Sequence, residues 1–514
     1  MASGFVIRKN EYYDSVFLMG INKRLSDVAG VKQTAVLMGT DANKRLLADI
    51  GIVGSEVKAA QANDLIVAVI AETDKVVREV IGNFDGILKD IATGTRTADV
   101  HTLSAAIEYK PEANLAVFSI PGDFVVDEAR KALESDLNVF IFSSNVPLPQ
   151  ELELKQLGRD RNLLVMGPDC GTSIINGVGI GFANVVRLGT IGVVGPSGTG
   201  LQEFTSLVHN AGGGISHAIG TGSKDLSDEI GGLTTLAAMQ VLESDSQTEV
   251  IAIIAKLPGG MTLAKLVDQA KSFTKPMIGC FLGSNRDSAS NYEPIQLSYT
   301  IDDAAAMALK AAKIVLEVDA DSEIDLDEER IDSVRAGWSA VQKHLRGVFA
   351  GGTFSYQAQQ ILGDAGLTIY SNGPIDVRLK LDDPDKSRGH TIVDMGDEHY
   401  TLGKPHPMID STERARRILA EASDPEVAIL LLDFILGYNA SNDPVGELVE
   451  TLQQAKTIRR KAGGELTIVA SVCGTKDDPQ ELDLQVKMLE ECGAHVFYSN
   501  ARAAEFCQRL LPYG

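Results

Sequence analysis

The chain has 514 residues, 44% of them hydrophobic, and a formal net charge of −23 at pH 7. That length allows three or four domains, and the acidic balance argues against a nucleic-acid-binding protein, which needs clustered Lys and Arg. Five scattered cysteines without C-x-x-C spacing argue against disulfides and structural zinc, and the lack of a signal-peptide pattern or a bilayer-length apolar run predicts a cytoplasmic protein with no membrane partner.

Residues 1–100 predict a small module of alternating strands and helices. Apolar runs suggest strands at 5–8, 31–38 and 65–70, and amphipathic patterns suggest helices at 14–25, 41–49 and 74–89. Thr40 or Asp41 would cap the second helix. The order of these short elements suggests an α+β module of the ferredoxin-like or ACT-like type. The polar segment 93–102 is interpreted as a linker.

Residues 105–188 predict the next domain. Strands are expected at 115–120, 138–142 and 163–166, with helices at 127–135 and 149–161. Strands that alternate with helices are typical of a doubly wound parallel sheet. Functional side chains in such sheets lie at the carboxyl ends of the strands, where Asp169, Cys170 and Thr172 fall. A polar turn without a function explains these three residues equally well.

Residues 189–318 open with the stretch TIGVVGPSGTGLQE at 190–203. It predicts a buried strand, a glycine turn and a helix start. Backbone N–H groups at a helix start have no intrahelical partner and favour anions, most often phosphate. We therefore expect Ser197, Gly198, Thr199 and Gly200 to bind phosphate or carboxylate. The stretch is neither a P-loop, since no Gly-Lys-Ser/Thr follows, nor a dinucleotide G-x-G-x-x-G.

Further strands of this domain are predicted at 215–222, 251–256 and 277–282. The turn Gly220, Thr221 and Gly222 and the strand-end residue Lys256 would line the same edge of the sheet as Ser197. A lysine beside backbone donors suits a phosphate, although most exposed lysines are merely solvated.

Residues 319–345 begin with the acidic run DADSEIDLDEE and are interpreted as a linker. Residues 346–514 predict a last α/β domain with a sheet of about five strands, at 346–350, 391–396, 427–433, 466–470 and 496–498. Gly351, Gly352 and Thr353 form a second strand–turn–helix unit. The segment 443–447 is a further candidate for an anion-binding helix start.

Together these passages resemble the succinyl-CoA synthetase superfamily, and most closely its FdrA-type branch, over residues 113–510. The residues that carry the resemblance are NLLVMGPDCGT, IGVVGPSGTGLQEF and DSQTEVIAII for the α subunit, FAGGT, TIVDMGDE and DPEVAILLLDF for the β subunit, and KPHPMID for FdrA-type proteins. The resemblance implies an α/β fold of tandem doubly wound parallel-sheet domains, Rossmann-like at 105–188 and flavodoxin-like in the ligase domains at 189–318 and 346–514.

The resemblance also implies that two helix starts face each other across a phosphoryl group. We expect them at 198–202 and 439–446, the second including Asn439 and Asn442. The family's phosphohistidine falls in a region that reads GSNRDSASNYEPI here and has no histidine, and Lys256 stands where the family has its supporting glutamate. The nucleotide-binding half of the β subunit and the CoA-cradling loop are missing, which makes CoA and nucleotide doubtful ligands.

The resemblance implies a carbamoyltransferase subunit, because FdrA-type proteins resemble a subunit of oxamate carbamoyltransferase in purine (allantoin) nitrogen breakdown, and these departures are compatible with that reaction. Its ligands would be carbamoyl phosphate, or another acyl phosphate, and an acceptor amide. Lys256 would neutralise the phosphate, residues 220–222 or 351–353 would polarise the carbonyl, and His406, held between two prolines, would act as general base or phosphate donor. A loop-packing role explains His406 as well.

Two other functions fit the same residues. One alternative function is an acid–thiol ligase, an NDP-forming acyl-CoA synthetase, with a relocated phosphoryl carrier; another is a regulatory subunit without catalysis. No cofactor is certain, and Mg²⁺ is left open. We expect additional carbamoyltransferase subunits as partners and a homo-oligomer, because the family's sites lie at domain interfaces.

Overall fold

The computed structural model describes residues 2–511 apart from 10, 12, 14, 27, 62, 87, 89–99, 285–289, 315–327 and 403. It divides into two compact units, which we describe separately. Unit 1 comprises Met1–Ala113 and Leu402–Pro405, and unit 2 comprises Asn114–Thr401 and His406–Gly514. Most of the linker predicted at 93–102, and residues 319–327 of the acidic linker, lie outside the described residues.

Unit 1 is built on a three-stranded sheet in the order β1-β3-β2, in which both pairings are antiparallel. Its elements are β1 (Ala2–Arg8), α1 (Ser15–Ser26), β2 (Val31–Met38), α2 (Asp41–Asp49), α3 (Ser55–Ala59), β3 (Leu65–Ala71), α4 (Asp74–Gly82) and α6 (Leu103–Tyr109). Thr40, one of the two predicted caps, accepts the Asn43 N–H at the start of α2. The alternating side chains of β3 enter two separate apolar clusters, so both faces of the sheet are covered.

Unit 2 begins with the three-stranded sheet β4-β5-β6, whose strand pairs are parallel. The elements are β4 (Leu115–Phe118), α7 (Gly122–Glu134), β5 (Asn138–Ile141), α8 (Leu148–Asp160) and β6 (Val165–Met166). They match the predicted alternation of strands and helices. The buried Lys155, on α8, donates a hydrogen bond to Asp225 Oδ1 at 2.7 Å. This ion pair links the first sheet of unit 2 to the second.

The second sheet of unit 2 has seven strands in the order β13-β12-β11-β9-β10-β7-β8. They are β7 (Thr172–Ile175), β8 (Val178–Gly181), β9 (Leu188–Gly195), β10 (Ile215–Gly220), β11 (Val250–Lys256), β12 (Met277–Leu282) and β13 (Gln296–Ser298), with helices α9 (Gly198–Asn210), α10 (Leu233–Ser244), α11 (Gly260–Ala270) and α12 (Ile301–Ala311). Strands β9 to β13 run parallel, whereas β7 is antiparallel to β10. Strands β7 and β8 fall within 105–188, but their hydrogen bonds belong to this sheet.

The third sheet of unit 2 is parallel throughout, in the order β15-β16-β14-β17-β18-β19. Its strands are β14 (His344–Phe349), β15 (Ile369–Ser371), β16 (His390–Asp394), β17 (Val427–Ile435), β18 (Thr467–Cys473) and β19 (His495–Phe497). Its helices are α13 (Glu328–Ala336), α14 (Gly352–Asp364), α15 (Glu398–Thr401), α16 (Thr412–Ser423), α17 (Gly446–Lys461), α18 (Leu482–Glu491) and α19 (Asn500–Leu510), with a 3₁₀ turn at Val377–Leu379. The sequence predicted five of the six strands and missed the three-residue β15. The described part of the predicted acidic linker contains α13.

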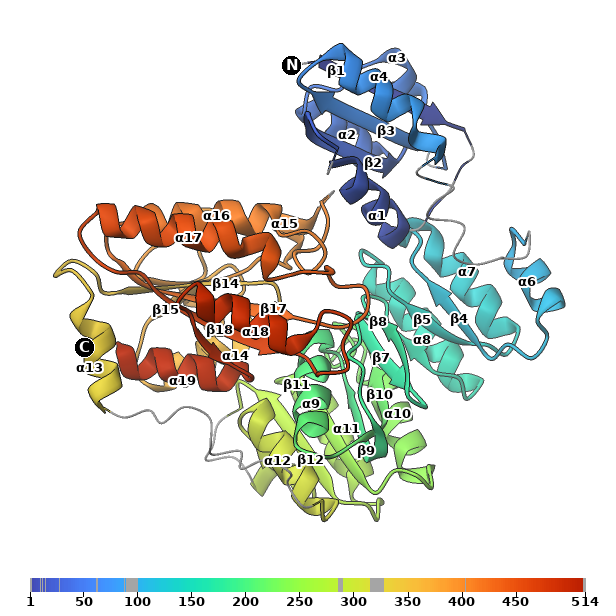
Figure 1. The fold of residues 1–514 in the computed structure, drawn as a ribbon. Coiled ribbons are helices and arrows are strands. Elements are labelled where there is room, and N and C mark those ends of the chain that lie inside the picture. Colours follow the sequence, from blue (N-terminus) through green and yellow to red (C-terminus); the bar gives the residue numbers. More distant parts are fainter. Residues whose placement is uncertain are drawn as a thin grey trace. The chain divides into compact units, whose positions relative to one another are not determined.

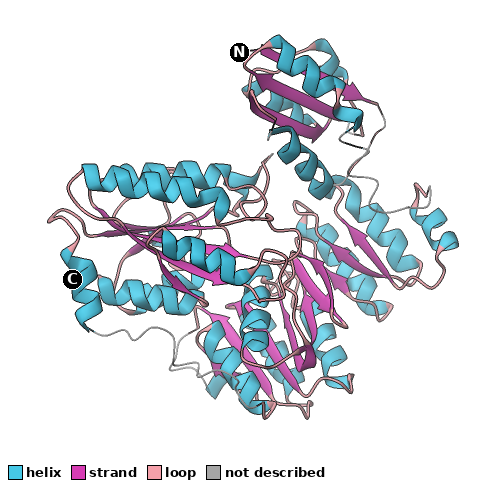
Figure 2. Cartoon of the chain, viewed as in Figure 1, coloured by secondary structure: helices cyan, strands magenta, loops and turns pink. Residues whose placement is uncertain are grey.

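The two larger sheets share one topological feature. In each, a strand lies between neighbours that come later in the chain on both sides: β9 between β11 and β10, and β14 between β16 and β17. Open parallel sheets bind ligands outside the carboxyl ends of their strands at such a switch point. Figures 1 and 2 show the helices α9 and α14 that follow these strands. Within the described residues, no helix is long and apolar enough to cross a membrane.

Candidate functional site

The starts of α9 and α14 meet each other, which brings the two switch points together. Ser197, the N-cap of α9, hydrogen-bonds through Oγ to Oγ1 of Thr353 in the first turn of α14. On the α9 side, the Thr199 methyl carbon lies 3.1 Å from the position that a Cβ would take on Gly351. We call residues 197–199 and 351–353 the helix junction.

The helix junction concentrates backbone N–H donors. Ser197 Oγ caps α9 by accepting the Gly200 N–H at 2.9 Å, so Gly200 itself is already bonded. The N–H groups of Gly198 and Thr199, in the first turn, have no acceptor among the described residues. Each helix also presents the positive end of its dipole here. Two such ends facing each other favour an anion between them.

A buried hydroxyl gives a second, independent sign of a ligand at the start of α9. Thr172 is 2% exposed, and its Oγ1 has no hydrogen-bond partner among the described residues. This oxygen lies 3.2 Å from the position that a Cβ would take on Gly198. A buried polar atom without a partner is costly unless something binds it. Thr172 therefore adds a donor directed at the first turn of α9.

A cation, Lys256, lies at the rim of the site, at the carboxyl end of β11. Its Nζ lies 4.7 Å from the centre of the Tyr356 ring on α14, a cation–π distance. Its charge also lowers the pKa of Asp394, at the end of β16. Because β11 and β16 belong to different sheets, Lys256 lies where the second and third sheets of unit 2 meet.

Asp394 is held firmly beside the first turn of α14. Its backbone exchanges two hydrogen bonds of 2.9 Å with the Asn372 side chain. Oδ1 accepts the Gly396 N–H at 2.9 Å, while Oδ2 lies 2.5 Å from the position that a Cβ would take on Gly352. Position 352 must therefore be glycine, since any side chain would displace the carboxyl group.

His406 lies beside Asp394. Its Nδ1 accepts the Met408 N–H at 3.3 Å, and its ring packs 5.9 Å from that of Phe182. Nε2 and Asp394 Oδ1 lie 2.9 and 3.1 Å from one point, the position that a Cβ would take on Gly396. Burial lowers the pKa of His406 to about 4. The ring is thus neutral at pH 7 and carries its proton on Nε2, on the side of Asp394.

Behind the helix junction, a buried ion pair fixes the start of α14. Asp433, on β17, accepts the N–H groups of Ala350 and Gly351, both at 2.8 Å. Arg414 donates to the same carboxylate at 2.7 Å and to the carbonyl of Val348. Burial raises the pKa of Asp433 and Arg414 lowers it. Both carboxylate oxygens are engaged, so this aspartate holds the loop in place.

The expected pairing of α9 with residues 439–446 is wrong, because α9 pairs with α14. Asn439 turns its side chain to the carbonyl of Gly181, at 2.6 Å, and Asn442 is exposed. At the start of α17, the Gly446 N–H is already bonded to Asp443 Oδ1 at 3.0 Å. A helix start that is capped by its own carboxylate has little attraction left for another anion.

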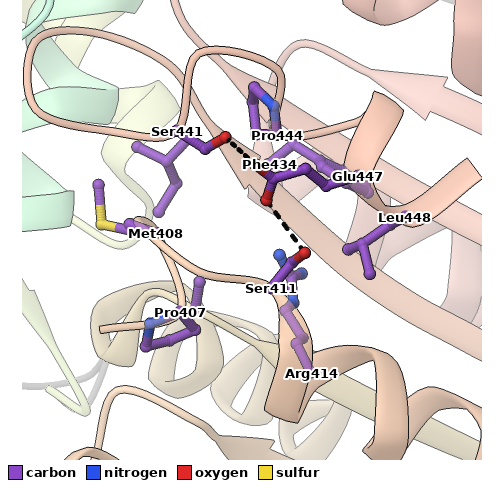
Figure 3. Close-up of a pocket in the computed structure, with 11 residues that line it drawn as sticks. Pro407, Met408, Ser411, Arg414, Phe434, Ser441, Pro444, Glu447 and Leu448 are labelled. Carbon is purple, nitrogen blue, oxygen red and sulfur yellow. Dashed lines mark hydrogen bonds between the residues drawn. The ribbon is translucent and has the colours of Figure 1, made fainter. Parts of the chain in front are cut away.

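Figure 3 shows a second carboxylate at the same helix start. Glu447, in the first turn of α17, accepts hydrogen bonds from Ser441 at 2.6 Å and from Ser411 at 3.0 Å. Arg414 and Met408 line the remaining cavity, whose volume is about 10 Å³. That is room for roughly one water molecule. The space beside the start of α17 is therefore largely filled by the protein itself.

The turn at Gly220–Thr221–Gly222 was expected to offer free backbone N–H donors, but most of them bond to the protein itself. The Gly220 N–H donates to Ser173 Oγ at 2.9 Å and the Thr221 N–H to the Gly195 carbonyl at 3.0 Å. The Thr221 carbonyl accepts from the buried Lys155. Gly222, at φ 87°, packs against the carbonyl of Pro168. Two of the three predicted donors are thus occupied and cannot polarise a substrate carbonyl.

The site residues that the sequence did not single out are Thr172 as a ligand, Tyr356 and Asp433. Thr172 follows a predicted strand and was equally well explained as a turn, while Asp433 ends a predicted strand as Asp394 does. Polar residues at strand ends were the available signal, but the sequence could not show which of them face the same point.

Comparisons with known proteins place parts of the chain in two families. Residues 348–510 match the CoA-ligase family, and residues 1–102 match a family described as AllF, heavy metal-associated domain. The chain is 40% identical to the uncharacterized protein YahF of Escherichia coli strain K12, over 100% of this chain and 99% of that protein. It is 24% identical to the α subunit of the ADP-forming succinate–CoA ligase of Methanothermobacter thermautotrophicus, over 36% of this chain and 63% of that subunit.

A solved structure was also matched, the dinucleotide-forming acetyl-coenzyme A synthetase 1 of Ca. Korarchaeum cryptofilum. It covers 81% of this chain and 87% of its own, at 17% identity and a TM-score of 0.31.

The heavy-metal description of residues 1–102 does not fit their composition. They contain no cysteine, and His101 is their only histidine, whereas heavy metals in proteins are held by thiolate or imidazole groups. In the part of the chain that the structure describes, no group of three or more His, Cys, Asp or Glu side chains could hold a metal ion. We therefore assign no metal chemistry to unit 1.

Proposed function

Because the chain belongs to the same family as YahF and carries a CoA-ligase domain, we propose that unit 2 binds an acyl phosphate at the helix junction and transfers its acyl group, as acid–thiol ligases do. The observation that carries the proposal is the bond between Ser197 and Thr353, which holds two helix starts against each other. An incoming anion would replace this bond and take both hydroxyls and the N–H groups behind them. Helix starts bind phosphate in this way.

In this proposal each group at the junction has one task. Gly198 and Thr199 offer backbone N–H donors, and Ser197, Thr353 and Thr172 offer hydroxyls. Lys256 supplies the positive charge that a phosphate dianion needs, without a carboxylate of its own at hydrogen-bonding distance among the described residues. Charge-assisted hydrogen bonds of this kind are about twice as strong as neutral ones.

The test is equilibrium binding of acetyl phosphate, carbamoyl phosphate and CoA to the full chain. We expect wild type to bind an acyl phosphate. Lys256→Ala should bind it about tenfold more weakly, a loss of roughly 1.4 kcal/mol, and Ser197→Ala should bind it more weakly still. The matched control is Lys271→Ala, whose ammonium group is exposed and paired with Asp268 on the surface. Failure of wild type to bind any acyl phosphate would overturn the proposal.

A carbamoyltransferase is the second candidate, and one observation favours it. The chain has no histidine between His217 and His344, so the α-like ligase domain lacks a phosphohistidine after β12, while Lys256 lies at the junction. Transfer from carbamoyl phosphate to an amide nitrogen needs no phosphohistidine and no CoA. The additional subunits and the homo-oligomer expected from the sequence belong to this proposal.

Two assays separate the candidates. A carbamoyltransferase, with its partner subunits, should release phosphate from carbamoyl phosphate only when an acceptor amide such as oxamate is present. A ligase should instead bind CoA and, with labelled nucleotide, form an acid-labile phosphoprotein. His406 faces Gly396 beside Asp394, so it is the candidate phosphoryl carrier. His406→Gln should abolish that label, while His399→Gln, a change at an exposed histidine, should retain it.

A further inference from the structure

Two aspartates flank the start of α14, the buried Asp433 and the partly buried Asp394, and only Asp394 has an oxygen to spare. Asp433 uses both oxygens on Arg414 and on the N–H groups of Ala350 and Gly351. Asp394 uses Oδ1 on the Gly396 N–H. No donor among the described residues reaches its Oδ2, which lies at the first turn of α14 beside Gly352. Asp394 therefore keeps one oxygen that a ligand at the first turn of α14 can meet.

The charges around Asp394 come from several elements. Lys256 approaches from β11 and favours the ionised carboxylate, whereas Asp397 in the following loop and Asp433 on β17 disfavour it. His406 faces the same glycine and is neutral. Burial is the largest influence and raises the pKa of Asp394 to about 7. At neutral pH the carboxyl group thus exists in both protonation states.

A carboxyl group in this place would oppose an anion if it stayed ionised. In the protonated form it donates a hydrogen bond instead, and so it becomes one more donor at the helix junction. From this geometry we infer that Asp394 is a catalytic acid–base residue, which gives a proton to the departing phosphate oxygen and takes back the proton that the acceptor loses. The inference rests on the proposed acyl transfer.

In the proposed step, an acyl phosphate reacts with a thiol or amide acceptor. The acceptor atom attacks the acyl carbon, and the bond between that carbon and the bridging phosphate oxygen breaks. Asp394 Oδ2 passes its proton to the phosphate, which leaves protonated. The resulting carboxylate then accepts the proton released from the S–H or N–H of the acceptor. General acid–base catalysis of this kind contributes typically 10²–10⁴-fold.

Sulfate binding tests the proton on Asp394 without the complication of a titrating ligand, because sulfate stays a dianion between pH 5 and 9. If binding requires protonated Asp394, the affinity of the wild-type chain falls about tenfold for each pH unit above neutrality. Asp394→Asn keeps a hydrogen-bond donor but cannot ionise, so its affinity should not change with pH. Asp397→Asn, a change at an exposed neighbour, should keep the same dependence of sulfate affinity on pH. The midpoint of that dependence should move to lower pH, because Asp397 raises the pKa of Asp394.

The outcomes separate the two proposals. If wild type binds sulfate and Asp394→Asn keeps the pH slope, the acid–base role is overturned while the anion site stands. If wild type binds neither sulfate nor an acyl phosphate, the proposed function itself fails. Infrared difference spectra supply a readout that does not depend on turnover: the protonated-carboxyl stretch that disappears from pH 6 to pH 9 should be smaller in Asp394→Asn than in wild type, and Asp302 and Glu203 account for the part that remains. A titrating band of unchanged amplitude in a folded Asp394→Asn variant would also overturn the role.

Discussion

Two carboxyl groups buried where elements of the second and third sheets of unit 2 meet make the stability of this unit depend on pH. Glu203, on α9, accepts the Asn500 N–H at 2.7 Å, and Asp302, on α12, accepts a hydrogen bond from Ser499. Asp302 Oδ2 is buried without a partner among the described residues. Burial raises the pKa of both groups, that of Asp302 to about 6, although Ser499 and Arg502 lower it.

The sign of the effect follows from the raised pKa. Below about pH 4, Asp302 is protonated in the folded and unfolded chain, and its contribution is fully present. As the pH rises to about 6, the unfolded chain releases the proton while the folded chain holds it, so stability falls by up to about 1.4 kcal/mol per pH unit. From the ordinary pKa of 3.8 to about 6, the loss reaches at most about 3 kcal/mol.

The perturbation is Asp302→Asn, which keeps the oxygen that accepts from Ser499 but cannot ionise. We expect the variant to gain up to about 3 kcal/mol relative to wild type between pH 4 and pH 7. Trp338, the single tryptophan of the chain, donates to Thr467 at 2.9 Å and reports unfolding of the third sheet by fluorescence in guanidinium titrations. The control is Asp303→Asn, the exposed neighbour on α12. Wild type and Asp302→Asn curves that stay parallel across this pH range would refute the reasoning.

Two further buried charges give predictions of their own. Asp433→Asn leaves Arg414 buried without its counter-charge, and we expect a loss of about 3–5 kcal/mol, measured by the same fluorescence titration; a loss below about 1 kcal/mol would show that the pair is dispensable. Lys155→Met leaves Asp225 buried without its counter-charge in the same way and should lose a similar amount, whereas Lys131→Met removes only an exposed ion pair and should leave the stability nearly unchanged. Equal effects of the two lysine variants would contradict the assigned burial.

The strands and the glycine turns at the helix junction could be predicted from the sequence because they are local. Residues 190–203 carry an apolar run, a glycine turn and an amphipathic helix within one short stretch, and β9 and α9 form there. The same pattern at 346–353 predicted β14 and α14. Hydrophobic periodicity and turn chemistry act between neighbours in the chain. Strand β15 was missed because three residues give no period.

The partner of α9 could not be predicted from the sequence. The segments 351–353 and 439–446 both look like anion-binding helix starts, and the resemblance gave no reason to prefer the first. The two segments differ in how their side chains are bonded in the folded protein. Asp443 accepts the Gly446 N–H at the start of α17, and Glu447 accepts hydrogen bonds from Ser441 and Ser411 beside it. Local sequence shows that a carboxylate is present, but not whether it caps its own helix.

The sequence by itself determined the α/β class, the alternation of elements and the glycine turns that end β9 and β14, because each depends on residues a few positions apart. Only the tertiary structure decided that Ser197 meets Thr353, that Lys256 lies over Tyr356, and that Asp394 keeps one oxygen free where Asp433 keeps none. These facts join groups from separate strands and separate domains. Packing of the two sheets brings them together, and the proton affinity of Asp394 follows from that burial, which no stretch of sequence contains.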